Sequence, residues 1–266
     1  MRSRGSDAMR SRMRPPDELR ALVETYLADL ALTPELGALT EPMRYAIGGK
    51  LVRPVLCLAV AEAAGAEPET ALPAAVAVEL VHSFSLVHDD LPALDDDEVR
   101  RGKPAVHVEF GETTAVLTGD ALLVEAFRLA LSYPTPEVAR ELAQTTAGMI
   151  GGQHLDLTAP GADRGEIRRL KTGALFGASV GCALWVAGMP EAEQQPWRAF
   201  AAELGPLFQL VDDIIDGDGA VLEHGPEEAR LLADSAASRA HERLDALGVD
   251  TSVLAGIVDG LAARTA

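Results

Sequence analysis

The feature that most constrains this chain is a helical spacing of apolar residues that continues almost without interruption from Pro16 onward. In the first such segment, apolar side chains recur three and four residues apart, as on one face of a helix. They are Leu19, Leu22, Val23, Tyr26 and Leu27. Glycine and proline fall between the periodic segments, and no stretch alternates convincingly as a strand does. The pattern predicts an all-α, single-domain bundle of about ten or more helices over residues 16–266.

The segment that precedes this domain has a different composition. Residues 1–15 hold five arginines and one acid, without an apolar run. We expect a disordered basic tail, and an Arg-rich transit peptide is the alternative. The chain has no run of about 18 uninterrupted apolar residues, so we also expect no stable membrane insertion.

The charge balance and the cysteines exclude several classes of function. The 266 residues carry 23 Lys and Arg against 41 Asp and Glu, a formal net charge of −18. Nucleic-acid binding and docking on anionic lipid need a surplus of cations, so we expect neither. Cys57 and Cys182 stand alone, without the spacing of a zinc site or a disulfide scaffold. They indicate a reducing compartment, and we expect a cytoplasmic protein.

Many of the acidic residues gather in two short stretches. The first acidic cluster is Asp89, Asp90, Asp95, Asp96, Asp97 and Glu98, and the second is Asp212, Asp213, Asp216 and Asp218. Each cluster lies at the end of a segment, 73–90 or 204–215, that is too apolar for a surface helix. The two clusters therefore lie where carboxylates are least expected.

Carboxylates packed this closely on apolar helices repel one another, so a cation must compensate them. Ligand sets made of oxygen alone suit hard cations, and Mg²⁺ prefers a few carboxylates together with substrate phosphates. A solvated acidic helix end is the alternative for a single cluster, but two clusters on apolar helices favour a metal site. Neither cluster follows the spacing of an EF-hand calcium loop.

The sparse basic residues lie beside glycines and beside the first acidic cluster. Lys50 and Arg53 follow a glycine pair (48–49) at a predicted helix start, where backbone N–H groups and cations together hold phosphate. Arg100 and Arg101 directly follow the first cluster. This combination predicts a site for one or two diphosphates bridged by Mg²⁺.

Six segments follow one another in order along the chain. They are GGKLVRP (48–54), VELVHSFSLVHDDLPALDDDEVRRGKPAVH (78–107), TGDALL (118–123), GGQHLDL (151–157), LKTGALFGASV (170–180) and FQLVDDIID (208–216). As an ordered set they resemble the trans-isoprenyl diphosphate synthases, or polyprenyl synthetases. The resemblance implies a helical fold with a central cavity between two facing aspartate motifs, and a homodimer. It also implies a Mg²⁺-dependent reaction in which an allylic diphosphate ionises and isopentenyl diphosphate attacks it head to tail.

The resemblance also implies roles for individual residues. The metal ligands would be Asp89, Asp90 and Asp95 in the first motif and Asp212, Asp213 and Asp216 in the second, together holding about three Mg²⁺ ions. The allylic diphosphate would contact Arg100, Lys171 and Gln209, and isopentenyl diphosphate would contact Lys50, Arg53, His82 and Arg101. Thr172 and Gln153 match positions whose oxygens face the developing cation. The residues implied to act in catalysis itself are Asp89, Asp90, Asp212, Lys171, Thr172 and Gln209.

Product length is implied by the residues just before the first motif. Phe84 lies five positions ahead of the first aspartate, with Ser85 beside it. In this family an aromatic residue there tends to block the pocket, which favours farnesyl diphosphate as the product. Geranylgeranyl or geranyl diphosphate is the alternative, with Phe84 as ordinary core.

The chain departs from the family after the second motif. Lysines that close over the allylic diphosphate are usual there, but this chain has no lysine after Lys171. Arg230 or Arg239 is the expected substitute.

Two other functions remain as alternatives. A class I terpene cyclase also ionises prenyl diphosphates, but it needs no isopentenyl site such as GGK-x-x-R. A catalytically silent partner subunit of a heteromeric synthase would typically have lost one aspartate motif, and this chain keeps both.

Overall fold

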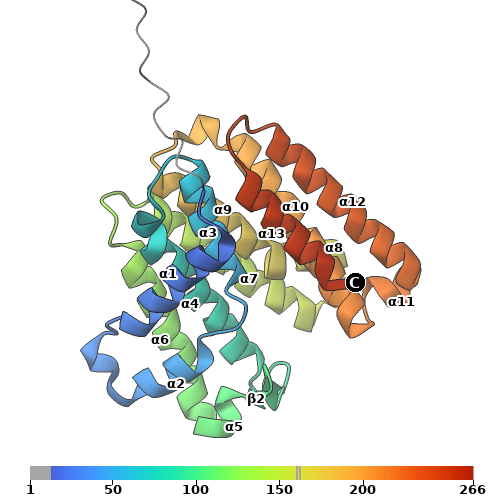
Figure 1. The fold of residues 1–266 in the computed structure, drawn as a ribbon. Coiled ribbons are helices and arrows are strands. Elements are labelled where there is room, and N and C mark those ends of the chain that lie inside the picture. The colour runs from blue at the N-terminus through green and yellow to red at the C-terminus, as the bar shows by residue number, and fades with distance from the viewer. Residues whose placement is uncertain (1–12, 160, 162, 266) are drawn as a thin grey trace, which may run out of the picture.

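The computed structural model describes residues 13–159, 161 and 163–265, and it confirms the predicted all-α fold (Figure 1). The helices are α1 (Pro16–Asp29), α2 (Thr40–Ala46), α3 (Val52–Ala63), α4 (Leu72–Asp89), α5 (Val106–Phe110), α6 (Glu112–Ala130), α7 (Glu137–Thr158), α8 (Arg164–Arg168), α9 (Ala174–Val186), α10 (Gln195–Asp216), α11 (Ala220–His224), α12 (Pro226–Asp245) and α13 (Ser252–Ala262). Short helical turns lie between them: η1 (Pro34–Leu39), η2 (Pro68–Ala71), η3 (Arg169–Gly173), η4 (Glu191–Glu193) and η5 (Ala263–Thr265). Strands β1 (Val99–Arg100) and β2 (Lys103–Pro104) form a small antiparallel hairpin after the first acidic cluster.

Helix α4 lies at the centre of the bundle, where it packs against α3, α6 and α9 (Figure 1). It is apolar on nearly every side, so only a position surrounded by other helices buries all of its surface. Together with the turn before it, the segment Pro68–Asp89 is long and apolar enough by length and composition to cross a membrane, but 72% of its most apolar window is buried inside the fold. A core helix of a helical bundle passes the same test. The consequence for the site is that the first acidic cluster begins where the central helix ends.

Helix α10 carries the second acidic cluster and packs against α9 and α12. It begins at Gln195, well ahead of the start that the sequence predicts, and Pro206 lies inside it. Gly205 allows α10 to approach η3 closely, because a Cβ there would lie 2.7 Å from the Cα of Gly173. This contact holds the middle of α10 against the turn that carries Lys171 and Thr172.

The predicted disordered tail extends to residue 15, and its first twelve residues lie outside the described residues. Met13 is buried, and Arg14 forms ion pairs with Glu62, Glu67 and Glu69. Met13 and Arg14 therefore pack against the bundle, although they precede Pro16, where the sequence predicts that the domain begins.

Candidate active site

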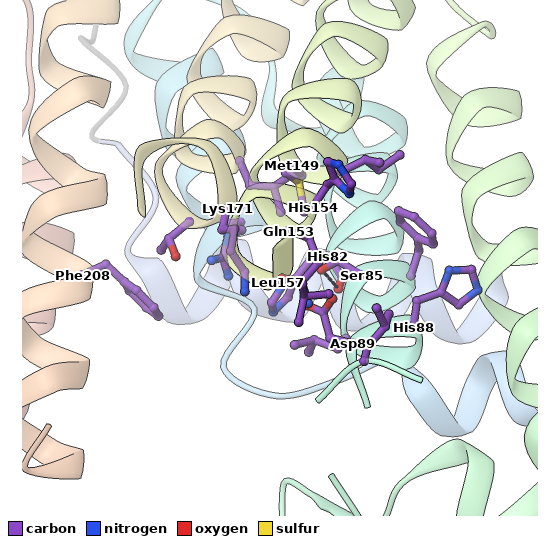
Figure 2. Close-up of a pocket in the computed structure, with 17 residues that line it drawn as sticks. His82, Ser85, His88, Asp89, Met149, Gln153, His154, Leu157, Lys171 and Phe208 are labelled. Carbon is purple, nitrogen blue, oxygen red and sulfur yellow. Dashed lines mark hydrogen bonds between the residues drawn. The ribbon is translucent and has the colours of Figure 1, made fainter. Parts of the chain in front are cut away.

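A cavity of about 450 Å³ opens between α4, α7, η3 and α10 (Figure 2). In Figure 2, Phe208 lies on one side of the cavity and His88 on the other, with Lys171 and Gln153 between them. Most of the lining surface is apolar and a few polar groups interrupt it, as is usual for small-molecule sites. The helices that line it include those that carry the two acidic clusters.

The first acidic cluster folds back on the end of α4. The Asp95 N–H donates to the Asp89 carbonyl over 2.9 Å, so the chain leaves the helix at Pro92 and returns. Asp89 lines the cavity, and the Gln153 amide on α7 donates to the Asp95 carboxylate over 3.4 Å. Burial, reinforced by the charges of Asp95 and Asp90, raises the pKa of Asp89 to about 6. The attraction of Lys171 and Arg100 opposes this rise but does not cancel the effect of burial.

Asp90, the second residue of this motif, does not line the cavity. It is 2% exposed, and the Arg100 guanidinium donates to its carboxylate from Nε over 2.9 Å and also from Nη2. Arg100 also donates to Asp97 over 2.6 Å. A protein cation thus already neutralises Asp90.

Asp213, the middle residue of the second motif, is held in a similar way. It is 3% exposed, and its carboxylate accepts from Gln209 over 2.7 Å and from Arg168 over 3.0 Å. The Ala220 N–H at the start of α11 donates to it over 2.8 Å. Asp213 therefore links α10, α8 and α11, and its oxygens are occupied by protein donors.

The other two carboxylates of the second motif lie closer to solvent. Arg264 donates to Asp212 over 3.1 Å from near the C-terminus. Burial raises the pKa of Asp212, and the attraction of Arg264 and of Lys50 opposes that rise. Asp216 is exposed at the end of α10.

The predicted metal ligands differ in their surroundings. An arginine pairs with the middle carboxylate of each motif, Asp90 or Asp213, and within the described residues no group of three or more His, Cys, Asp or Glu side chains is close enough to hold a metal ion. The set of metal ligands therefore stays a prediction. All of its donors are carboxylate oxygens, and burial raises the pKa values of Asp89 and Asp212. Such donors fit Mg²⁺ whose coordination is completed by substrate phosphates.

Lys171 and Thr172 lie in η3, a π-helical turn of the kind that is frequent at functional sites. Lys171 donates to Asp156 on α7 over 2.7 Å, and the Thr172 hydroxyl donates to Gln209 over 3.3 Å. Asp156 is a site residue that sequence reasoning missed. The sequence could have indicated it: Asp156 lies three residues after Gln153 in GGQHLDL, so the two side chains share one side of α7.

Arg53 is buried next to the cavity with an unpaired nitrogen. It is 8% exposed, and its guanidinium lies 4.9 Å from the Phe176 ring centroid and 5.3 Å from that of Phe208. Its Nε is buried without a hydrogen-bond partner among the described residues. His82 lies 3.5 Å from Arg101, and burial together with Arg53 and Arg101 holds the pKa of His82 well below its usual range. A neutral imidazole and buried cations are the groups that would receive an anion here.

The floor of the cavity is made by Phe84 and His88, whose rings meet edge to face with centroids 5.0 Å apart. His88 Nε2 lies 3.0 Å from the Val116 carbonyl on α6. A Cβ on Gly119 would come within 2.0 Å of that nitrogen, so only glycine leaves room for the His88 ring. Ser85 lines the cavity and bonds back to its own helix.

The family model described as Polyprenyl synthetase matches residues 37–226, which include both acidic clusters and every wall of the cavity. The chain belongs to the polyprenyl synthetase family.

Curated relatives of this polyprenyl synthetase include plant and bacterial proteins. It is 43% identical over 216 residues to the heterodimeric geranylgeranyl pyrophosphate synthase large subunit 1 of Arabidopsis thaliana, an alignment that covers 73% of this chain and 58% of that protein. It is 40% identical over 200 residues to the farnesyl diphosphate synthase of Bacillus subtilis, covering 69% and 68%. The chain thus spans from just over half to about two thirds of the length of the relatives it matches.

Solved structures place the same fold in related proteins. A geranyltransferase from Legionella pneumophila superposes with a TM-score of 0.81 at 27% identity, over 94% of both chains. A geranylgeranyl pyrophosphate synthase superposes with a TM-score of 0.85 at 25% identity, over 96% of this chain and 100% of that one. The isoprenoid synthase fold expected from the resemblance is therefore confirmed.

The structure brings eight of the seventeen predicted site residues around one cavity. Those that line it are Arg53, His82, Phe84, Ser85, Asp89, Gln153, Lys171 and Thr172. Gln209 and Asp213 line an adjoining polar cavity, Arg100 and Arg101 line a third, and Lys50 is exposed.

The expected substitutes for the missing lysines are not beside the second cluster. Arg239 donates to Glu203 over 2.9 Å, and Arg230 is exposed on α12. The arginines that contact the second cluster are Arg168 and Arg264. No local pattern indicates either contact, because each joins residues that lie far apart in the chain.

Proposed function

We propose that the chain is a short-chain trans-prenyltransferase, which joins isopentenyl diphosphate head to tail to an allylic diphosphate. The observation that carries this proposal is the mixed lining of the cavity. Most of its surface is apolar, but Asp89, Lys171 and Arg53, whose Nε has no hydrogen-bond partner among the described residues, also line it. A prenyl chain matches the apolar lining, and diphosphates match the charged groups. Membership of the polyprenyl synthetase family supports the same class of reaction.

In the proposed reaction the bond between the allylic carbon and the diphosphate oxygen breaks, and its electron pair leaves with the diphosphate. The double bond of isopentenyl diphosphate then forms the new carbon–carbon bond, and the adduct loses a proton to the released diphosphate. Met149 and Leu157 supply apolar wall that keeps water from the cation. The Gln153 side-chain oxygen is buried without a hydrogen-bond partner among the described residues, which leaves an acceptor to stabilise positive charge.

Magnesium, about three ions in all, would supply Lewis-acid stabilisation of the charge that develops on the leaving diphosphate. The residues that would hold it are Asp89 and Asp95 in the first motif and Asp212 and Asp216 in the second. Asp90 and Asp213 would instead fix the loops that follow each motif, through Arg100 and Arg168.

We propose farnesyl diphosphate as the main product, because Phe84 and His88 close the cavity just below Asp89. Geranylgeranyl diphosphate is the second candidate, and the names of most relatives favour it, among them the geranylgeranyl diphosphate synthase of Cyanophora paradoxa, which is 41% identical over 193 residues. The two products differ by one isoprene unit, so the depth of the cavity above Phe84 and His88 decides between them.

We also propose a homodimer. Helix α6 and the residue after it expose four large apolar side chains, which a second copy would cover. They are Val116, Leu117 and Val124 on α6, and Leu131 just beyond it. Sedimentation of the pure protein tests this, and a monomer at micromolar concentration would refute it. The cytoplasmic location stays a prediction.

The test of the function is incubation of the pure protein with Mg²⁺, isopentenyl diphosphate and the C5, C10 or C15 allylic diphosphate, followed by chromatographic sizing. We expect a C15 product from the C5 and C10 substrates. The Asp89→Asn and Asp212→Asn variants should lose turnover, whereas Asp245→Asn, an exposed carboxylate on α12, should keep it. If none of the three substrates yields a product, the proposed enzyme activity is refuted, and the alternative of a catalytically silent partner subunit remains.

A further inference from the structure

A second, polar cavity of about 300 Å³ adjoins the apolar one. Lys171 and Thr172 line both cavities, so the polar cavity opens at the diphosphate end of the proposed site. Three basic residues line it: Arg164 and Arg168 on α8, and Lys171 on η3. Their spacing of four and three residues places them on one face of this helical stretch.

The roof of the polar cavity is the short segment that follows the second acidic cluster. Residues 217–225 connect α10 to α12, and they include the short helix α11. Gly219 has a φ of +45°, and a Cβ there would lie 2.3 Å from Asp213 Oδ2 and 2.7 Å from Arg168 Nη2. The segment therefore rests directly on the Arg168–Asp213 pair, and it holds no lysine.

Arg168 is fixed in this position but remains accessible. Its side chain is 28% exposed, and its contact with Asp213 engages one of the two terminal nitrogens. A guanidinium has five N–H donors, so one carboxylate does not use its capacity. Arg164 is 72% exposed, and its ion pair with Glu223 is long, at 3.8 Å. Both cations can contact a ligand in the cavity without leaving the fold.

The charges in the cavity are balanced when no ligand is present. Lys171 pairs with Asp156 and Arg168 pairs with Asp213. Three carboxylates, Asp156, Asp213 and Asp218, line the cavity beside the three cations. A divalent cation that accompanies a diphosphate adds positive charge here, and the N–H groups of Arg164, Arg168 and Lys171 that no carboxylate uses then have phosphate oxygens as partners. A cavity with three cations on one face suits a diphosphate better than a prenyl chain.

We propose that Arg164 and Arg168 bind the diphosphate group that leaves the allylic substrate, and that they provide the positive charge for which this chain has no lysine after the second cluster. The inference rests on the proposed function, which it deepens by two binding residues. Arg168 contacts the diphosphate from the wall of the cavity, and Arg164 contacts it from the rim.

The test uses inorganic diphosphate with Mg²⁺ as the probe, measured by calorimetry on the full chain. Loss of a hydrogen bond to a charged group costs about 1.5–3 kcal/mol, so Arg168→Gln should bind diphosphate at least ~10-fold more weakly. Arg164→Gln should bind it ~3-fold or more weakly, since this residue is more exposed. The matched control is Arg169→Gln, because Arg169 is the next residue, pairs with Glu166 and does not line the polar cavity. The control should stay within about twofold of the wild type on the same affinity scale.

Kinetics provide the second measurement. The KM for the allylic diphosphate should rise in Arg164→Gln and Arg168→Gln, while the KM for isopentenyl diphosphate stays unchanged. Because Arg164 is exposed, Arg164→Gln should fold normally and tests the role of this cation in diphosphate binding even if Arg168→Gln fails to fold. Unchanged diphosphate affinity in Arg164→Gln, or an equal loss in Arg169→Gln, would overturn the inference. Weakened diphosphate binding in a chain whose wild type makes no prenyl product would support these two residues and refute the proposed function.

Discussion

The contact between Gly205 on α10 and Gly173 on η3 leads to a prediction about activity and stability together. Gly205→Ala would place a methyl carbon 2.7 Å from the Gly173 Cα. Carbon atoms settle at about 3.5–4.0 Å, so α10 and η3 must separate by roughly 1 Å. No side-chain rotation relieves this contact, because the obstructing atom belongs to the backbone.

The separation acts directly on the candidate site. Thr172 precedes Gly173, and Gln209 lies one turn after Gly205, so the 3.3 Å hydrogen bond between Thr172 and Gln209 would stretch beyond bonding range. A misplacement of about 1 Å can lower the rate by up to ~100-fold. We therefore expect kcat/KM for the allylic substrate to fall by about 10- to 100-fold.

The matched control is Gly177→Ala on α9, where a Cβ meets nothing within 4 Å. Both variants gain the helix propensity of alanine, about 1 kcal/mol, so their difference isolates the overpacking cost of about 1–3 kcal/mol. At about 2–4 °C per kcal/mol, Gly205→Ala should melt roughly 2–12 °C below Gly177→Ala. Thermal unfolding and steady-state kinetics measure both effects, and a Gly205→Ala protein equal to the control in both would refute the reasoning.

Two further predictions concern the floor of the cavity and a buried acid. Phe84→Ala should lengthen the product by at least one isoprene unit, whereas Phe110→Ala, which removes a ring on α5 outside the cavity, should leave it unchanged; an unaltered product in Phe84→Ala would remove that residue from chain-length control. Glu79 is buried, and burial raises its pKa from 4.5 to about 7. The folded state therefore holds this proton more tightly than the unfolded state, and stability should fall by up to roughly 3 kcal/mol as the pH rises from about 4.5 through 7. Glu79→Gln should gain stability relative to the wild type over that range in urea unfolding, and a difference that does not vary with pH would contradict the assignment.

The course of α4 could be predicted because its sequence leaves few choices. Apolar residues on all sides require a central helix, and the break at Pro92 requires the chain to turn just after Asp89 and Asp90. The cavity beside Phe84 and Ser85 was instead implied by the resemblance to a known family, because periodicity alone does not show where helices leave a space. Periodicity and turn residues are local properties of the sequence, so they can be recognised without knowledge of the tertiary structure.

The partners of the site residues could not be predicted in the same way. Asp212 and Asp213 cannot be distinguished from the sequence. The orientation of α10 about its axis determines that Asp213 is buried against Arg168, whereas Asp212 accepts a hydrogen bond from Arg264. These pairs join residues 45 and 52 positions apart. Nothing in a local pattern selects Arg168 over Arg239, which pairs with Glu203 instead.

The net charge of −18 includes carboxylates with two different roles, and the ion pairs distinguish them. In each acidic cluster an arginine fixes the middle carboxylate, so the loop that follows has a rigid anchor that needs no ligand. Asp89 and Asp212 lie partly buried with raised pKa values, so folding places negative charge where water cannot fully solvate it. A ligand that brings positive charge to these carboxylates recovers that free energy on binding, and it binds more tightly because the carboxylates were desolvated beforehand. In the proposed function Asp90 and Asp213 anchor the loops and the other carboxylates would bind Mg²⁺, and the bound cations would allow an acidic chain to bind an anionic substrate.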